Sequence, residues 1–262
     1  MRKYLALAKI HGWEDFDKDH LRLFSEVVTS NLAQSSARTV FASLKGLLGR
    51  NEELAVNLPK DWRGIISAKN EKTIKTFLTK KELKALEDVD TKNAYEQTVK
   101  YDFLISARTG MRISDTLAVT PENFVTYPDG RIYLDYVSKK TKVRAQVPVS
   151  ERTVEMVKWV QENGAAVPLC TYNINLRKLC KRAGLTQQVR VFRAGEYVTS
   201  PKWAQISSHS ARVSFCTNLA ICGLDLLTIS RMAGHTGIEQ TERYIQRFDI
   251  KLNPLAEKYL ND

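Results

Sequence analysis

Four short segments, far apart in the chain, carry the polar side chains that most restrict how it can fold. They supply two arginines, three lysines, two histidines and a tyrosine: Arg112, Lys139, Lys140, Lys142, His209, Arg212, His235 and Tyr244. Two guanidinium groups can hold a phosphate, lysine and imidazole can carry protons, and a phenol can act as a nucleophile. To act together, these side chains must meet at one place, so the fold has to unite distant parts of the chain.

The charge balance favours a polyanionic partner. The 262 residues contain 40 lysines and arginines against 29 aspartates and glutamates, a net charge of +11. With a pI near 9.4, such an excess of positive charge is typical of proteins that bind nucleic acid. The alternative is an ordinary globular protein that is merely basic, and charge alone favours nucleic acid only slightly.

The cysteines and the N-terminus indicate a compartment. The four cysteines form no CxxC pair and do not stand at zinc-finger spacing from the histidines. We therefore expect reduced, mostly buried thiols in the cytoplasm, with no metal and no other cofactor. The N-terminus has no signal-peptide core, and no apolar run is long enough to span a bilayer.

Helical periodicity dominates the first 70 residues. Asp17 is placed to cap one helix, and Ser35 and Ser36 to cap a second helix that ends at Gly49. A polar stretch then interrupts the periodicity. We predict a helical domain over residues 1–70, a linker over 71–78 and a second domain over 79–262.

The second domain is predicted to mix helices with small β-hairpins. Thr79 can cap a helix, a longer helix leads to the turn at Gly110, and another should carry Ile113, Leu117 and Ala118. Two alternating apolar stretches predict strands on either side of the lysines: Ile132, Leu134 and Tyr136 on one, and Val143, Ala145 and Val147 on the other. A second hairpin is predicted around Gly195. The fold class is therefore mainly α with small β-hairpins, or α+β.

Each polar segment is a weak signal by itself. Arg112 follows a glycine turn, and an arginine there could bind phosphate, yet an ion pair with Asp115 is the simpler interpretation. His209 and Arg212 share one helix face, as many unrelated pairs do. Tyr244 is one of ten tyrosines.

Together and in this order, however, the segments resemble the tyrosine recombinase (phage integrase) family, in particular mobile-element integrases. Three features carry the likeness: the Thr-Gly-Met-Arg turn with Asp115 three residues on, the His209-x-x-Arg212 pair, and Tyr244 nine residues after His235 with Thr241 between them. Lys140 stands eight residues before Pro148, as the family's hairpin lysine does. The resemblance covers nearly the whole chain, with departures at Ala211 and Val213.

The resemblance implies a mechanism and a role for each residue. Tyr244 would attack a phosphodiester and form a 3′-phosphotyrosine intermediate, while Arg112, Arg212 and His235 bind the phosphate. His209 would accept the tyrosine proton, and Lys140 would protonate the leaving oxygen, although Lys139 or Lys142 could take that role. Asp115 would orient the cluster.

The resemblance also implies partners. Double-stranded DNA would be bound by both domains, since residues 1–70 carry 11 basic and 8 acidic side chains and the remainder carries 29 and 21. Arg38, Lys45, Lys139 and Lys142 are candidate DNA contacts, though an ordinary solvated helix face explains Arg38 or Lys45 singly.

Assembly follows the same resemblance. A homotetramer on paired sites, a monomer off DNA and DNA-bending accessory proteins are expected, and no separate arm-binding domain is expected before residue 1. The apolar tail residues Leu252, Leu255, Tyr259 and Leu260 could dock on a neighbouring protomer or fold back.

Three other functions fit parts of the sequence. A type IB topoisomerase or a hairpin telomere resolvase would use the same chemistry with a different product. A non-catalytic DNA-binding regulator would need the basic surface but not the ordered set of residues, and an RNA-binding or structural protein has only the net charge in its favour. The sequence indicates neither the target site nor the direction of reaction.

Overall fold

The computed structural model describes residues 1–68, 76–193 and 196–245 and divides the chain into two compact units. The first unit comprises residues 1–73 and 190–198, and the second comprises 74–189 and 199–262. Most of the predicted linker and all of the apolar tail residues lie outside the described residues. The predicted boundaries at residues 70 and 79 therefore stay a prediction.

The first unit is a group of helices around an apolar core. Its helices are α1 (Arg2–Leu7), a 3₁₀ turn η1 (Trp13–Asp15), α2 (Lys18–Asn31), α3 (Gln34–Leu48) and α4 (Trp62–Ile65). Phe24 of α2 packs on Phe41 of α3, with ring centroids 6.1 Å apart. The predicted cap at Asp17 is confirmed, because its carboxylate accepts hydrogen bonds from two backbone N–H groups of the first turn. The predicted cap at Ser35–Ser36 is wrong, because α3 begins earlier, after Ala33.

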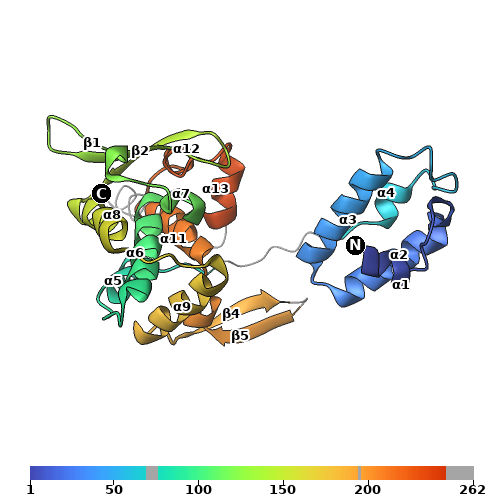
Figure 1. Cartoon of the computed structure of the whole chain (residues 1–262), viewed down its shortest axis with the longest axis horizontal. Helices are drawn as coiled ribbons and strands as arrows, with labels where there is room; N and C mark the ends of the chain where they lie inside the picture. The colour runs from blue at the N-terminus through green and yellow to red at the C-terminus, as the bar shows by residue number, and fades with distance from the viewer. Residues whose placement is uncertain (69–75, 194–195, 246–262) are drawn as a thin grey trace, which may run out of the picture. The chain divides into compact units, whose positions relative to one another are not determined.

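The second unit is larger and contains the predicted motifs. Its helices are α5 (Lys80–Glu87), α6 (Ala94–Thr109), α7 (Ile113–Thr116), η2 (Pro121–Asn123), α8 (Glu151–Asn163), α9 (Leu169–Arg182), α10 (Lys202–Gln205), α11 (Ser208–Ile221), α12 (Leu226–Met232) and α13 (Ile238–Ile245). Helix α6 lies at the centre and packs against α8, α9 and α11 (Figure 1). Since α6 is covered on several sides, ten of its residues are buried, including polar ones such as Asp102.

The turn after α6 positions the first motif. Thr79 caps α5 as predicted, and α6 ends at Gly110, whose φ of 72° is the left-handed conformation that favours glycine. The next helix, α7, is a single turn and leaves Leu117 exposed, so the longer helix predicted there is wrong. After Thr116 the backbone makes the tighter i→i+3 bonds instead, from Ala118 N–H to the carbonyl of Asp115 and from Val119 N–H to that of Thr116. Pro121 then disfavours a helical conformation at Thr120, so the helix cannot resume there.

A three-stranded antiparallel sheet carries the lysine hairpin. Its strands are β1 (Phe124–Thr126), β2 (Ile132–Val137) and β3 (Arg144–Val149), with β2 in the middle. Tyr136 pairs with Ala145, and both side chains lie on the buried face. The predicted β2–β3 hairpin is confirmed, whereas β1 was not predicted. The second predicted hairpin is also present, as β4 (Gln188–Arg193) and β5 (Glu196–Pro201).

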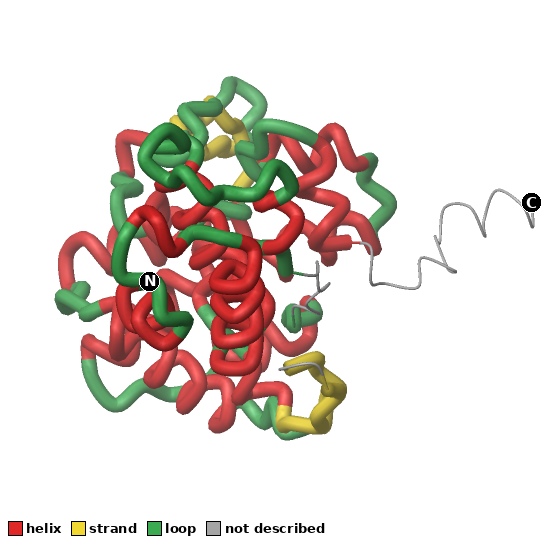
Figure 2. The backbone as a smooth tube through the Cα atoms, turned by 90° about the vertical axis from the view of Figure 1, so that its right-hand side faces the viewer, coloured by secondary structure: helices red, strands yellow, loops and turns green. Residues whose placement is uncertain are grey.

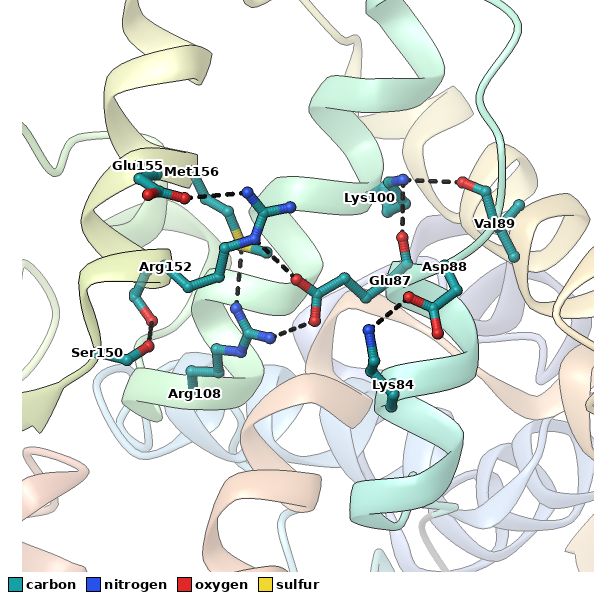
Figure 3. Close-up of polar contacts among 11 residues, drawn as sticks. Lys84, Glu87, Asp88, Val89, Lys100, Arg108, Ser150, Arg152, Glu155 and Met156 are labelled. Atoms are coloured by element: carbon teal, nitrogen blue, oxygen red, sulfur yellow. Dashed lines mark hydrogen bonds and ion pairs between the residues drawn. The ribbon is translucent and has the colours of Figure 1, made fainter.

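A polar cluster joins α5, α6 and α8 (Figure 3). The Glu87 carboxylate accepts hydrogen bonds from Arg108 of α6 and from Arg152 of α8. Burial raises the pKa of Glu87, but the two arginines outweigh it and hold this pKa below its usual value. The ammonium group of Lys100 donates to the carbonyls of Glu87 and Val89, at 3.1 and 2.8 Å, and so satisfies the C-terminal end of α5.

Most of the described backbone is helical, and its strands are confined to two small sheets (Figure 2). This confirms the predicted fold class. Within the described ranges, no helix has both the length and the apolar character that crossing a membrane requires.

Candidate active site

The tip of the β2–β3 hairpin is tied to the Arg112 turn by a short hydrogen-bond chain. Arg112, the residue before α7, donates from Nη1 to Ser138 Oγ at 2.9 Å. The Ser138 hydroxyl in turn donates to Asp115 Oδ2 at 3.1 Å, and the backbone N–H of Lys139 donates to Asp115 Oδ1 at 3.0 Å. Asp115 therefore holds the hairpin and orients Arg112 through Ser138, rather than forming a simple surface ion pair.

A second tie fixes the other side of the hairpin tip. The Thr141 hydroxyl donates to the carbonyl of Gly234 at 3.1 Å, directly before His235. Lys140 lies in the turn between these two anchored residues, and its side chain is exposed. The two ties restrict where the Lys140 backbone can move while leaving its ammonium group in solvent.

The two arginines meet at the end of α6. Arg212 of α11 is only 1% exposed, and its Nη1 donates to the carbonyl of Gly110 at 2.7 Å. Its Nε and Nη2 are buried and have no hydrogen-bond partner among the described residues. Burial lowers the pKa of the Arg112 guanidinium, and the like charge of Arg212 lowers it further. Because these two positive charges act on one another in a partly buried site, a bound anion would be favoured beside them.

Gly110 has a steric as well as a conformational reason to be glycine. A Cβ at this position would lie 2.5 Å from Cδ1 of the Phe215 ring, and Phe215 stands one turn after Arg212 on α11. We expect Gly110→Ala to displace α11, to lower the free energy of unfolding and to slow any reaction that needs Arg212. Urea unfolding and a DNA-cleavage assay would measure the two effects.

Gly130→Ala is the matched control for this variant. Gly130 has a similar φ of 80°, but nothing lies within 4 Å of a Cβ there. It should therefore cost only the backbone strain, about 1–2 kcal/mol. An equal loss of stability and activity in both variants would show that contact with Phe215 is unimportant.

His235 lies just after the turn that ends α12, and its side chain is buried. Its Nδ1 is 2.7 Å from the hydroxyl of Thr241, and its Nε2 is buried without a hydrogen-bond partner in the described part of the chain. Burial, and then the charges of Arg212 and Arg112, lower the pKa of His235 to about 3. The imidazole is therefore neutral at neutral pH and can still donate one N–H.

Tyr244 lies between the two histidines. Its ring centroid is 5.4 Å from that of His209 and 5.5 Å from that of His235. Helix α13 places it there by burying Thr241 and Ile245. Burial raises the pKa of the Tyr244 phenol, and the charge of Arg212 partly offsets this. The phenol is thus protonated at neutral pH and needs a base before it can attack.

Two residues of the site were not singled out from the sequence. The Tyr136 hydroxyl is buried with no hydrogen-bond partner among the described residues, and it would lie 3.6 Å from a Cβ at Gly234. Burial raises the pKa of Tyr136 to about 12, against the opposing charges of Arg212 and Arg112. Ser138 is fully buried and bridges Arg112 and Asp115. In the sequence, Tyr136 is indistinguishable from a core strand residue, and Ser138 from a hairpin residue.

The structure thus brings Arg112, Arg212, His235 and Tyr244 together, with His209 against Tyr244 and Lys140 on the adjoining turn. For the four candidate DNA contacts, the structure shows only how exposed each side chain is. Lys139 and Lys142 are exposed on the same turn. In the first unit, Arg38 is exposed and Lys45 is half-buried on α3. The buried face of this helix carries Ala37, Phe41 and Leu44.

Possible metal ligands form no common group among the described residues, and the cysteines are unpaired thiols. Among the residues that the structure describes, no group of three or more histidine, cysteine, aspartate or glutamate side chains could hold a metal ion. All four cysteines are free, with Cys180 and Cys216 buried and Cys170 and Cys222 exposed. The expectation of mostly buried thiols therefore holds for two of the four.

Comparison with known proteins decides the family. Residues 76–250 match the model of the phage integrase family, a range that includes every predicted catalytic residue. The chain belongs to the phage integrase family. As a tyrosine recombinase, it is an enzyme that breaks and rejoins DNA at specific sites.

Relatives match over most of this recombinase. It is 25% identical over 250 residues to tyrosine recombinase XerD of Neisseria meningitidis serogroup B, covering 93% of this chain and 83% of XerD. It is 25% identical over 265 residues to tyrosine recombinase XerC of Bacillus licheniformis, covering 92% and 80% of the two chains.

Solved structures share the fold of this recombinase. XerH site-specific recombinase bound to its palindromic difH substrate, in a post-cleavage complex, aligns with a TM-score of 0.66 at 18% identity, covering 94% of this chain and 71% of XerH. A lambda integrase dimer bound to a COC′ core site gives a TM-score of 0.63 at 16% identity, covering 93% and 87%. The Tn1549 transposon integrase with transposon right end DNA gives 0.62 at 14% identity, covering 100% and 92%.

Proposed function

We propose that Tyr244 is the nucleophile of this recombinase and that it forms a 3′-phosphotyrosyl link with one DNA strand, releasing a 5′ hydroxyl. Arg112, Arg212, His235 and Tyr136 bind the phosphate, His209 accepts the phenol proton, and Lys140 protonates the leaving oxygen. The 5′ hydroxyl of a partner duplex then reverses the step and joins the strands.

One observation carries the proposal: among the described residues, buried polar atoms without hydrogen-bond partners gather around Arg212 and Tyr244. They are Nε and Nη2 of Arg212, Nε2 of His235 and the hydroxyl of Tyr136. Buried polar groups in proteins almost always have partners, so several orphans in one place indicate a missing polar ligand. A phosphate offers several acceptor oxygens, and its transition state carries more negative charge than its ground state. Donors held ready for that charge lower the barrier.

The protonation state of His235 suits this task. A neutral imidazole donates from one nitrogen only. If the Thr241 hydroxyl donates to Nδ1, the proton resides on Nε2 and points at the phosphate. Because the pKa of His235 is about 3, it cannot take the proton of Tyr244 at neutral pH. That step falls to His209, whose ring centroid lies 5.4 Å from that of Tyr244.

The step balances in bonds and protons. The Tyr244 oxygen forms a bond to phosphorus as the bond from phosphorus to the 5′ oxygen breaks. The phenol proton passes to His209, and a proton from Lys140 passes to the departing oxygen. One phosphodiester replaces another, so the exchange needs no external energy source.

The role of Lys140 as general acid can be tested by changing the atom that leaves the phosphorus. We expect Lys140→Ala to slow cleavage of ordinary DNA by about 10²–10⁴-fold, because the 5′ oxygen then departs without a proton. A substrate with sulfur at the bridging 5′ position should restore most of the rate, because a thiolate leaves without protonation.

Lys139→Ala and Lys142→Ala are the matched controls, since both residues are exposed on the same turn. Each should weaken DNA binding and show no selective rescue by sulfur. If one of them were rescued and Lys140→Ala were not, the assignment of the general acid would move to that residue.

The assembly is proposed from the same family. XerH was solved bound to its difH site, and lambda integrase as a dimer on a core site. For this chain we propose duplex DNA gripped by both units and a homotetramer on paired sites, with DNA-bending accessory proteins where the sites require them. Sedimentation on one site and on paired sites would measure the assembly.

The polarity of the covalent link tests the proposal. On a nicked suicide substrate, trapped protein should block the 3′ end of the cleaved strand, and the released end should be labelled by polynucleotide kinase without phosphatase treatment. Protein attached to a 5′ end would contradict the mechanism. Exchange between paired sites, rather than relaxation of a supercoiled plasmid, would separate a recombinase from a topoisomerase.

A further inference from the structure

A cavity in the second unit is lined by none of the residues assigned to the recombination chemistry. It has a volume of about 580 Å³ and lies between α6, the segment after α7, α8 and the loop that follows α8. Most of its lining is apolar, including Ile105, Val119, Val157 and Val160. This volume lies within the range of pockets that bind small molecules, about 300–1,000 Å³.

One charged residue lines this otherwise uncharged cavity. Asp102 of α6 is fully buried at the cavity wall, and neither of its carboxylate oxygens has a hydrogen-bond partner among the described residues. A ligand in the cavity therefore reaches the carboxylate only when neighbouring wall side chains shift. The neighbouring threonines do not help, because Thr98 donates to Ala94 and Thr116 donates to Arg112. A buried carboxyl group without a partner is costly, and such groups are rare away from functional sites.

We propose that this cavity binds a small organic cation, a compact apolar body with one protonated amine or amidine that pairs with Asp102. The apolar walls accept the body, and the carboxylate supplies the one charge-assisted hydrogen bond that fixes its orientation. Desolvation raises the pKa of Asp102 to about 7, so the empty site holds a proton that an arriving cation displaces.

The surroundings of Asp102 make it the group that titrates. It is the only ionisable residue that lines the cavity. The charge of Asp102 acts on Tyr172 of α9, but burial holds the pKa of that phenol well above its usual value, so it stays neutral. Two residues of the cavity wall, Thr116 and Leu117, directly follow Asp115 in the chain.

Binding of benzylamine to the whole chain tests the proposal, with benzyl alcohol as its neutral isostere. Isothermal titration should show benzylamine binding that tightens about tenfold from pH 6 to pH 8, as the ionised fraction of Asp102 rises. Asp102→Asn should lose at least about tenfold in affinity. Val119→Phe, which places a larger side chain at a buried position of the cavity wall and keeps Asp102, should lose binding too.

The control variant is Asp90→Asn, which removes an exposed carboxylate and should bind like the wild type. The proposal is overturned if benzylamine fails to bind at millimolar concentration, if benzyl alcohol binds equally well, or if Asp102→Asn binds as tightly as the wild type. Failure would leave the recombinase mechanism untouched, because DNA cleavage by these variants is measured separately.

Discussion

Replacement of Tyr244 by phenylalanine should abolish covalent attachment to DNA and slow strand cleavage by at least about 10⁴-fold, because no other group supplies the nucleophile. The ring would keep its place between His209 and His235, since the substitution removes only the hydroxyl. DNA affinity should therefore stay near that of the wild type. Trapping on a nicked substrate measures attachment, and gel shift measures affinity.

Tyr101→Phe is the matched control. Tyr101 is a half-buried residue of α6 that packs edge-on against Trp159, away from the site. It should form covalent complexes at the wild-type rate. Equal trapping by Tyr244→Phe and by the wild type would mean that a different residue is the nucleophile.

Asp102 should make the free energy of unfolding depend strongly on pH. Burial raises the pKa of Asp102 from 3.8 to about 7, so between these values the folded chain holds a proton that the unfolded chain has released. Stability must then fall as pH rises through this window. Asp102→Asn lacks this proton, so its free energy of unfolding relative to the wild type should rise by about 4 kcal/mol between pH 4 and pH 8.

The difference in the free energy of unfolding between the wild type and Asp102→Asn isolates the contribution of Asp102. Carboxylates with lowered pKa, such as Glu82 and Glu87, give stability a slope of the opposite sign, and they are common to both proteins. Urea unfolding followed by tryptophan fluorescence would measure the difference at each pH. A constant difference across this range would show that Asp102 does not carry a raised pKa.

Local patterns in the sequence predicted the elements that position the site. The cap at Thr79, the glycine turn at Gly110 and the alternating residues on either side of Lys140 each depend on a few neighbouring residues. These patterns therefore hold in the structure. The length of α7 did not, because the backbone tightens into i→i+3 bonds after Thr116, and the apolar pattern that suggested a longer helix carries no sign of this.

The remaining features depend on contacts between distant segments. Ser138 bridges Arg112 and Asp115 only because the hairpin folds onto the α7 turn. Tyr136 follows the same alternation as Leu134, so nothing local separates a hydroxyl in the site from an ordinary core residue. Asp102 likewise stands in a buried helix face where sequence alone shows neither the cavity nor the missing partner.

The residue that becomes joined to DNA can be identified directly, and this tests the role proposed for Tyr244. Covalent complexes trapped on a nicked substrate can be trimmed with nuclease, digested with protease and sequenced by mass spectrometry. We expect a nucleotide attached through phosphate to Tyr244 of the wild-type protein and no modified peptide from Tyr244→Phe. A nucleotide on any other residue of the wild type would contradict that role.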